Sequence, residues 1–214
     1  LDSGVDAEIA RIPERAGEGL QGPGTGVGAA FQRRYSVRIS GSALTAEQLI
    51  QRLCEDLNVA APVEFAVFDK TSGTSPSLET GDEYDVHMPG PWNCPVRVVE
   101  RTAVSFRFVT LRGHMEAGEI EFRATDTPEG DLLFAIESWA RSGDRLAEAV
   151  YDRLRIGKEM QLHMWTHFCV RTAELSGGRI EGEVEVRSVR AYAPGLVSRV
   201  AARVFALMAW LRGG

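Results

Sequence analysis

The chain has 214 residues, 44% of them hydrophobic, and a formal net charge of −6. So much apolar surface supports a sizeable core and excludes a globally disordered chain, and the length suits one large domain with appendages. The acidic balance argues against nucleic acid as a partner, because phosphate binding requires clustered cations.

The cysteines and the hydropathy pattern indicate in which cellular compartment the protein is expected. Cys54, Cys94 and Cys169 are odd in number and widely spaced, so they predict neither a disulfide framework nor a zinc site. The sequence has no cationic stretch followed by an apolar leader, and no apolar run of the length that spans a bilayer. We therefore expect a cytoplasmic protein without a spanning helix.

Residues 1–30 are rich in glycine and carry two prolines. Such a stretch has little to bury and much backbone entropy to lose, so we expect a flexible arm. The glycines do not match a phosphate-binding loop, because no GK[ST] follows and the GxGxxG spacing is absent.

Residues 33–40 alternate between apolar and polar side chains, which predicts a half-buried strand. A short helix follows. Thr45 is placed to be its N-cap and Gln48 to complete a capping box. Its expected buried face consists of Leu49, Ile50, Leu53, Cys54 and Leu57.

Strand patterns dominate the next part of the chain. Hairpin-length connections between them require a mostly antiparallel sheet. The last segment is apolar on both faces and is therefore expected at the centre of the sheet. The predicted segments are 63–68, 83–88, 96–101, 104–111, 119–125 and 132–140.

The stretch 142–178 is predicted to be one long helix of about nine turns. Ser142 or Asp144 can cap its start, and Gly177 and Gly178 can stop it. Its apolar stripe consists of Leu146, Val150, Leu154, Gly157, Gln161, Met164, Phe168 and Leu175.

Residues 179–214 form a predicted C-terminal extension. Residues 180–186 alternate as an edge strand with an acidic outer face, and residues 195–212 form an apolar helix. This helix can pack against the domain, contact a second subunit or lie on a membrane. The pattern favours packing over membrane contact, and a homodimer through residues 179–214 is the alternative.

The predicted class is therefore α+β. A curved antiparallel sheet of about seven strands grips one long C-terminal helix, with a short helix after the first strand. We expect the arm 1–30, the main domain 31–178 and the extension 179–214. One helix cannot fill a curved sheet completely, so the architecture predicts an internal cavity.

This order of elements resembles the START-like, helix-grip superfamily (SRPBCC-type), which includes lipid-transfer domains, polyketide cyclases and the birch-pollen allergen fold. Residues 81–122 resemble an uncharacterised bacterial and plant domain family of unknown function within it. The resemblance covers roughly residues 33–178 and implies a fold and a pocket, without a reaction. The residues that carry it best are Thr110, Leu111, Gly113, His114, Glu116, Gly118, Glu119 and Phe122.

Several polar residues are candidates for chemistry. His114, Glu116, Glu119 and Glu121 cluster in one hairpin, where a histidine beside carboxylates could act as an acid or base, or could only stabilise a turn. Glu137 and Gln161 are expected to face the interior, where each could orient a ligand or satisfy a neighbour. The predicted ligand-contacting residues are Tyr84, Trp92, Phe106, Phe108, Trp139, Gln161 and Trp165.

His163 and His167 stand four residues apart, which is also a spacing of metal ligands. The glutamate of an HExxH motif is absent, and a third ligand would have to come from Glu159, His87 or His114. We therefore favour two hydrogen-bonded rings at a helix edge and expect neither a metal nor a cofactor.

The leading functional hypothesis is binding of a small hydrophobic or amphipathic molecule between sheet and long helix. The alternative is a cyclase- or hydrolase-like enzyme that uses an acid–base pair from His114, Glu116, Glu137 and Gln161. A third hypothesis is an adaptor that binds partners through the arm and the terminal helix.

Overall fold

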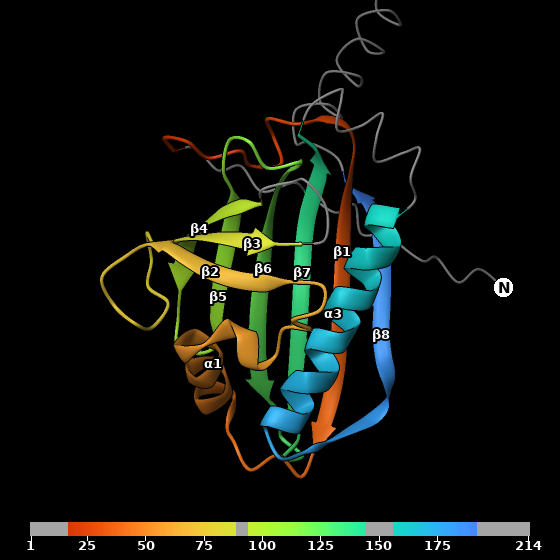
Figure 1. The fold of residues 1–214 in the computed structure, drawn as a ribbon. Helices are drawn as coiled ribbons and strands as arrows, with labels where there is room; N and C mark the ends of the chain where they lie inside the picture. Colours follow the sequence, from red (N-terminus) through yellow and green to blue (C-terminus); the bar gives the residue numbers. More distant parts are fainter. Residues whose placement is uncertain (1–16, 89–93, 144–155, 192–214) are drawn as a thin grey trace, which may run out of the picture.

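A computed structural model describes residues 17–88, 94–143 and 156–191. Its main feature is an eight-stranded sheet in the order β2-β3-β4-β5-β6-β7-β1-β8 (Figure 1). All neighbouring strands are antiparallel, as the short connections predict. The strands are β1 (Val27–Ser40), β2 (Val67–Ser72), β3 (Glu83–His87), β4 (Pro95–Arg101), β5 (Ser105–Thr110), β6 (Glu116–Asp126), β7 (Leu132–Ser142) and β8 (Arg179–Ala191).

The short helix α1 (Ala46–Glu55) begins as predicted. The Thr45 hydroxyl accepts a hydrogen bond from the Gln48 amide, and the Gln48 side chain accepts one from the Thr45 amide. A 3-10 turn (Leu57–Val59) follows. The expected strand at 63–68 is wrong in its bounds: residues 62–66 form a turn, closed by bonds from Phe65 and Ala66 to the Pro62 carbonyl, and β2 starts only at Val67.

The long helix is shorter than predicted. Helix α3 spans Ile156–Leu175, about 30 Å, and ends where Gly177 adopts a φ of 74°. Ser142 does not cap it, because Ser142 is the last residue of β7 and pairs with Val27 and Glu116. Asp144 and the first part of the predicted stripe lie outside the described residues.

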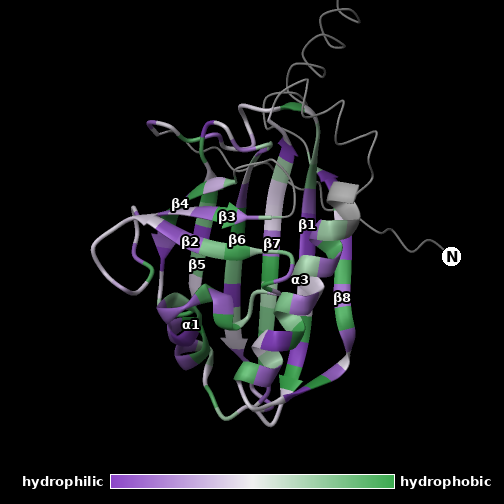
Figure 2. Cartoon of the chain, in the orientation of Figure 1, coloured by the Kyte–Doolittle hydropathy of each residue, from purple (hydrophilic) through white to green (hydrophobic). Residues whose placement is uncertain are grey.

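The described part of α3 packs on the inner face of the sheet, against β1, β7 and β8 (Figure 1). Its buried side carries Met164, Trp165, Phe168 and Cys169, whereas Leu162 is exposed. Figure 2 shows hydrophobic residues both along α3 and on the strands beside it. Phe122 of β6 joins the two layers, with its ring centroid 5.6 Å from that of Trp165. The sheet therefore grips the helix, and the predicted fold class is confirmed.

The end of the glycine-rich segment is hydrogen-bonded to the sheet. The Gln21 amide donates to the Thr110 carbonyl, and the Gln21 carbonyl accepts from the Gly118 amide. At Gly26 an added Cβ would lie 2.4 Å from the Ser142 carbonyl oxygen, so a close approach explains this glycine. Residues 17–26 thus lie against β5–β7, and β1 begins at Val27, inside the predicted arm.

Strand β8 is at one edge of the sheet, as expected. Its charged side chains are exposed, which discourages edge-to-edge aggregation. Val186 and Val189 are also exposed. A homodimer through residues 179–214 stays a prediction, and the predicted helix 195–212 lies outside the described residues.

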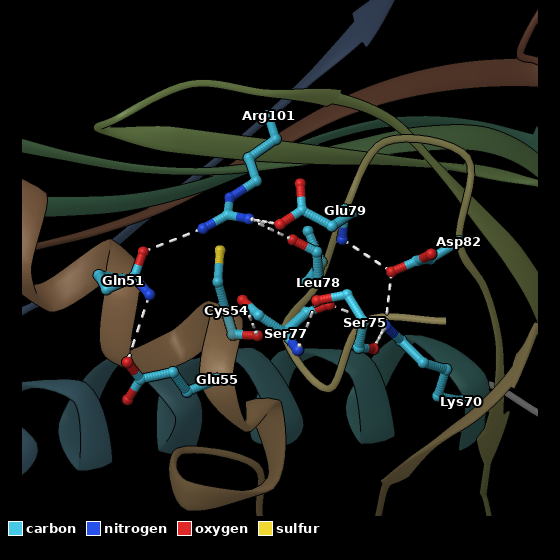
Figure 3. A network of polar contacts seen from close by, with 10 residues as sticks. All are labelled: Gln51, Cys54, Glu55, Lys70, Ser75, Ser77, Leu78, Glu79, Asp82 and Arg101. Atoms are coloured by element: carbon cyan, nitrogen blue, oxygen red, sulfur yellow. Dashed lines mark hydrogen bonds and ion pairs between the residues drawn. The ribbon is translucent and has the colours of Figure 1, made fainter. Parts of the chain in front are cut away.

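Lys70 holds one part of the loop between β2 and β3, and Arg101 contacts Leu78 and Glu79 of the same loop (Figure 3). The Lys70 ammonium lies 2.5 Å from the Asp82 carboxylate and donates to the carbonyls of Ser75 and Ser77, 2.8 Å away in each case. Asp82 is buried and also accepts from the Glu79 amide. A single cation therefore satisfies three oxygens that fix the loop.

We expect Lys70→Met to lower the free energy of unfolding by about 2 kcal/mol, because it leaves the buried Asp82 carboxylate without its cation. Urea denaturation followed by circular dichroism measures this change. The matched control is Arg38→Met, which breaks a more exposed pair with Asp131 and should cost less than about 1 kcal/mol. Equal losses in the two variants would contradict the role given to Lys70.

Candidate functional site: a cavity between sheet and helix

A cavity of about 260 Å³ lies between α3 and the inner face of the sheet. Strands β2 to β7 and the β5–β6 turn supply its sheet side, and the first described residues of α3 supply the helix side. Most of the lining is apolar. Aromatic and sulfur-containing side chains dominate this lining: Phe68, Phe108, Phe122, Trp165, Met88, Cys94, Met115, Met160 and Met164.

The lining also includes polar side chains. The Gln161 amide nitrogen of α3 donates to Glu116 Oε2 of β6 at 2.8 Å. Gln161 Oε1 accepts from the Arg33 guanidinium of β1 at 3.1 Å. The amide thus links a cation and a carboxylate on two different strands, and it ties α3 to both.

His114 is another polar group of the lining, in the turn between β5 and β6. Its Nδ1 accepts a hydrogen bond from the Glu116 backbone amide at 2.9 Å, so the neutral ring carries its proton on Nε2. Burial lowers the pKa of His114 from its ordinary value, and the nearby Glu116 charge opposes this only in part. The side chain of Gln21 donates to the carbonyls of His114 and Glu116 and holds the turn in place.

The lowered pKa of His114 predicts a pH effect on stability. Below the ordinary pKa of 6.5 the unfolded chain takes up a proton that the folded protein does not, so stability falls as the pH drops from there. Between pH 7.5 and 5.5 the wild type should lose about 1 kcal/mol more than His114→Asn, whose side-chain oxygen can still accept from Glu116. Urea denaturation at both pH values checks this. A His114→Asn variant that lost as much stability as the wild type over this pH range would contradict the prediction.

The structure brings six of the predicted site residues to the cavity. They are Phe108, His114, Glu116, Glu119, Gln161 and Trp165.

Other predicted residues lie elsewhere. Tyr84 and Phe106 are buried in the core but do not line the cavity, and Trp92 lies outside the described residues. Glu137 and Trp139 are on the opposite face of β7, because strand side chains alternate and Ser138 and Ala140 face the cavity. Glu137 contacts Gln32 and Arg34 there.

The predicted cluster around His114 is also divided between the two faces of the sheet. The carboxylates of Glu119 and Glu121 contact Arg107 at 2.6 and 3.1 Å, and the Arg107 guanidinium lies 5.8 Å from the Trp139 ring centroid. These residues form an ion-pair cluster on the outer face. Glu116 shares the inner side with His114, and Glu119 also borders the cavity although its carboxylate pairs with Arg107.

Sequence reasoning did not assign Arg33 or the methionines to the site. Arg33 has the same strand parity as Tyr35, so alternation could have placed it on the inner face. Burial raises the pKa of the Cys94 thiol to about 12, so Cys94 is a protonated, apolar part of the wall.

His163 and His167 lie at the exposed edge of α3, with ring centroids 4.1 Å apart. His163 also contacts the Phe65 ring edge-on, at 4.8 Å between centroids. Among the described residues, no three His, Cys, Asp or Glu side chains are grouped so that they could hold a metal ion. In the same part of the chain, no helix has the length and hydrophobicity needed to cross a membrane.

Comparison with known proteins identifies the family. A family model described as a domain of unknown function, DUF1990, matches residues 45–171, more than half of the chain. The chain belongs to the DUF1990 family. The match confirms the resemblance to an uncharacterised domain family. A search of curated proteins finds no match to this DUF1990 chain.

Solved structures resemble this DUF1990 domain in fold. A hypothetical protein from Helicobacter pylori has a TM-score of 0.50 and 8% identity, covering 67% of this chain and 86% of its own. Norcoclaurine synthase from Thalictrum flavum has a TM-score of 0.49 and 10% identity, covering 78% and 98%. Major latex-like protein 151 from Panax ginseng has a TM-score of 0.45 and 14% identity, covering 70% and 99%. Identities this low concern the fold alone.

Proposed function

We propose that this DUF1990 domain binds a small amphipathic molecule in the cavity between the sheet and α3. The observation that carries the proposal is an apolar cavity of about 260 Å³ whose lining includes polar side chains. Binding sites are typically concave and apolar, with a few polar groups that fix the orientation of the ligand. The arrangement of Gln161, Glu116 and His114 fits this description.

The cavity volume limits the size of the ligand. An engineered cavity of about 150 Å³ is known to hold benzene, whereas typical drug-sized pockets begin at about 300 Å³. A cavity of about 260 Å³ lies between them. We therefore infer a guest of about one or two rings, or an aliphatic chain of similar volume.

The hydrogen bond at His114 favours binding over acid–base catalysis. A general base needs a free lone pair, and the lone pair on Nδ1 already accepts from the Glu116 amide. Glu137, the third member of the proposed acid–base set, is on the opposite face of β7. What His114 can offer a guest is the Nε2–H donor.

Calorimetric titration with 2-naphthol and with its saturated analogue decahydro-2-naphthol tests the proposal. Native mass spectrometry of the purified protein should first show whether a co-purified molecule must be removed. We expect at least one of the two compounds to bind with 1:1 stoichiometry and a Kd below about 1 mM. Absence of binding by both compounds to protein freed of co-purified molecules would overturn the proposal.

A further inference from the structure

The methionines of the chain gather at the cavity. Four of the five, Met88, Met115, Met160 and Met164, line it, and the fifth, Met208, lies outside the described residues. Cys94 adds another sulfur, 4.0 Å from that of Met88. The described core contains no methionine away from this cavity. The sulfur atoms are therefore concentrated where a guest would lie.

Aromatic rings complete the same cavity. Phe108 contacts Phe68 and Phe122, with centroids 6.4 and 6.3 Å apart, and Phe122 contacts Trp165 at 5.6 Å. The rings already pack against one another in stacked or edge-to-face geometry, as the aromatic quadrupole favours. A planar ring entering the cavity would extend this packing on one side.

Thioether sulfur is polarisable and makes favourable contacts with the edges of aromatic rings. Its side chain is also unbranched, so it can adapt to flat guests of different outline. A saturated guest of the same skeleton offers no π system to the sulfurs or to the phenyl rings. The lining should therefore distinguish the two kinds of guest by the π system and the planarity of the aromatic one, while the connectivity of the carbon skeleton is the same.

We propose that the cavity selects a planar aromatic compound of one or two rings over an aliphatic compound of the same skeleton. One hydroxyl or comparable group of the guest contacts Gln161 and Glu116. The Gln161 amide uses one hydrogen toward Glu116 and has a second to donate. This inference rests on the proposed binding function, and it adds the chemical class of the ligand.

The test compares 2-naphthol with decahydro-2-naphthol, which share the carbon skeleton and the hydroxyl group; the saturated compound lacks the π system and is puckered instead of planar. The double variant Met115→Leu/Met160→Leu removes two sulfurs at nearly constant volume. We expect the affinity for 2-naphthol to fall about tenfold and that for decahydro-2-naphthol to stay within about twofold. Calorimetric titration of both proteins with both compounds measures the four affinities.

The matched control is Ile120→Leu, which alters the shape of the lining without removing sulfur. It should change the two affinities by the same factor. If the methionine double variant changes the affinities for both compounds by the same factor, or leaves the affinity for 2-naphthol unchanged, the proposed aromatic selection is overturned. The binding function would still stand in that case. If the wild type binds neither compound, the binding function itself fails, and the inference fails with it.

Discussion

Replacing Phe122 with alanine is expected to lower the free energy of unfolding by about 3–5 kcal/mol, the largest loss among the variants considered. Phe122 is completely buried and lies where sheet and helix meet. Its ring stacks on Phe106 at 4.7 Å and contacts Phe168 of α3 at 5.3 Å. Truncation would remove both contacts and leave a void between the layers.

Urea denaturation of wild type and Phe122→Ala gives the difference directly. Val63→Ala is the matched control, because Val63 is 50% exposed and its truncation should cost less than about 0.5 kcal/mol. A loss below about 1 kcal/mol for Phe122→Ala would mean that α3 is not held on the inner face through this ring.

Ser138→Phe is expected to weaken binding of 2-naphthol at least 100-fold. Ser138 lines the cavity from β7, opposite Ile120 of β6 and Arg33 of β1. A cavity of about 150 Å³ holds benzene, so by that measure a phenyl ring at this position would take more than half of the available volume. The remaining space would be too small for a two-ring guest.

Titration of the folded variant with 2-naphthol measures the loss, and its circular dichroism spectrum shows that the sheet is intact. Ser188→Phe is the control, since Ser188 is an exposed serine of the edge strand β8, and its affinity should equal that of wild type. Unchanged binding by Ser138→Phe would place the guest somewhere other than this cavity.

Structural features that depend on residues close together in the sequence were predictable. The capping box of Thr45 and Gln48 depends on residues three apart, and it formed as expected. The antiparallel order of the strands also follows from short connections. The acidic edge strand β8 was recognisable because its alternation continues over several residues.

Structural features that depend on contacts between residues far apart in the sequence were not predictable. Ser142 has the chemistry of an N-cap, but pairing with Val27 and Glu116 keeps it in β7. The sequence predicts Gly26 to be part of a flexible arm, whereas the close approach of its backbone to the Ser142 carbonyl explains why a glycine is present. In both cases the deciding contact joins residues more than twenty positions apart.

The candidate site was predicted only in part, again because its geometry depends on contacts between distant segments. Glu137 was expected inside because its neighbours in the strand are apolar, yet alternation with Phe134 and Ile136 directs it to the outer face. The strand carries apolar residues on both faces there, so hydrophobicity alone could not distinguish them. The volume of the cavity and the gathering of methionines around it depend on packing among many elements, and the sequence carries no local signal for either.

The most direct test of the account is a crystal structure of the protein soaked with 6-bromo-2-naphthol, with anomalous data collected at the bromine edge. We predict one bromine peak inside the cavity bounded by Phe108, Trp165 and Gln161, with the hydroxyl of the compound next to the Gln161 amide. Bromine found only at the protein surface, with the cavity unoccupied at saturating ligand, would contradict the claim that this space binds a guest.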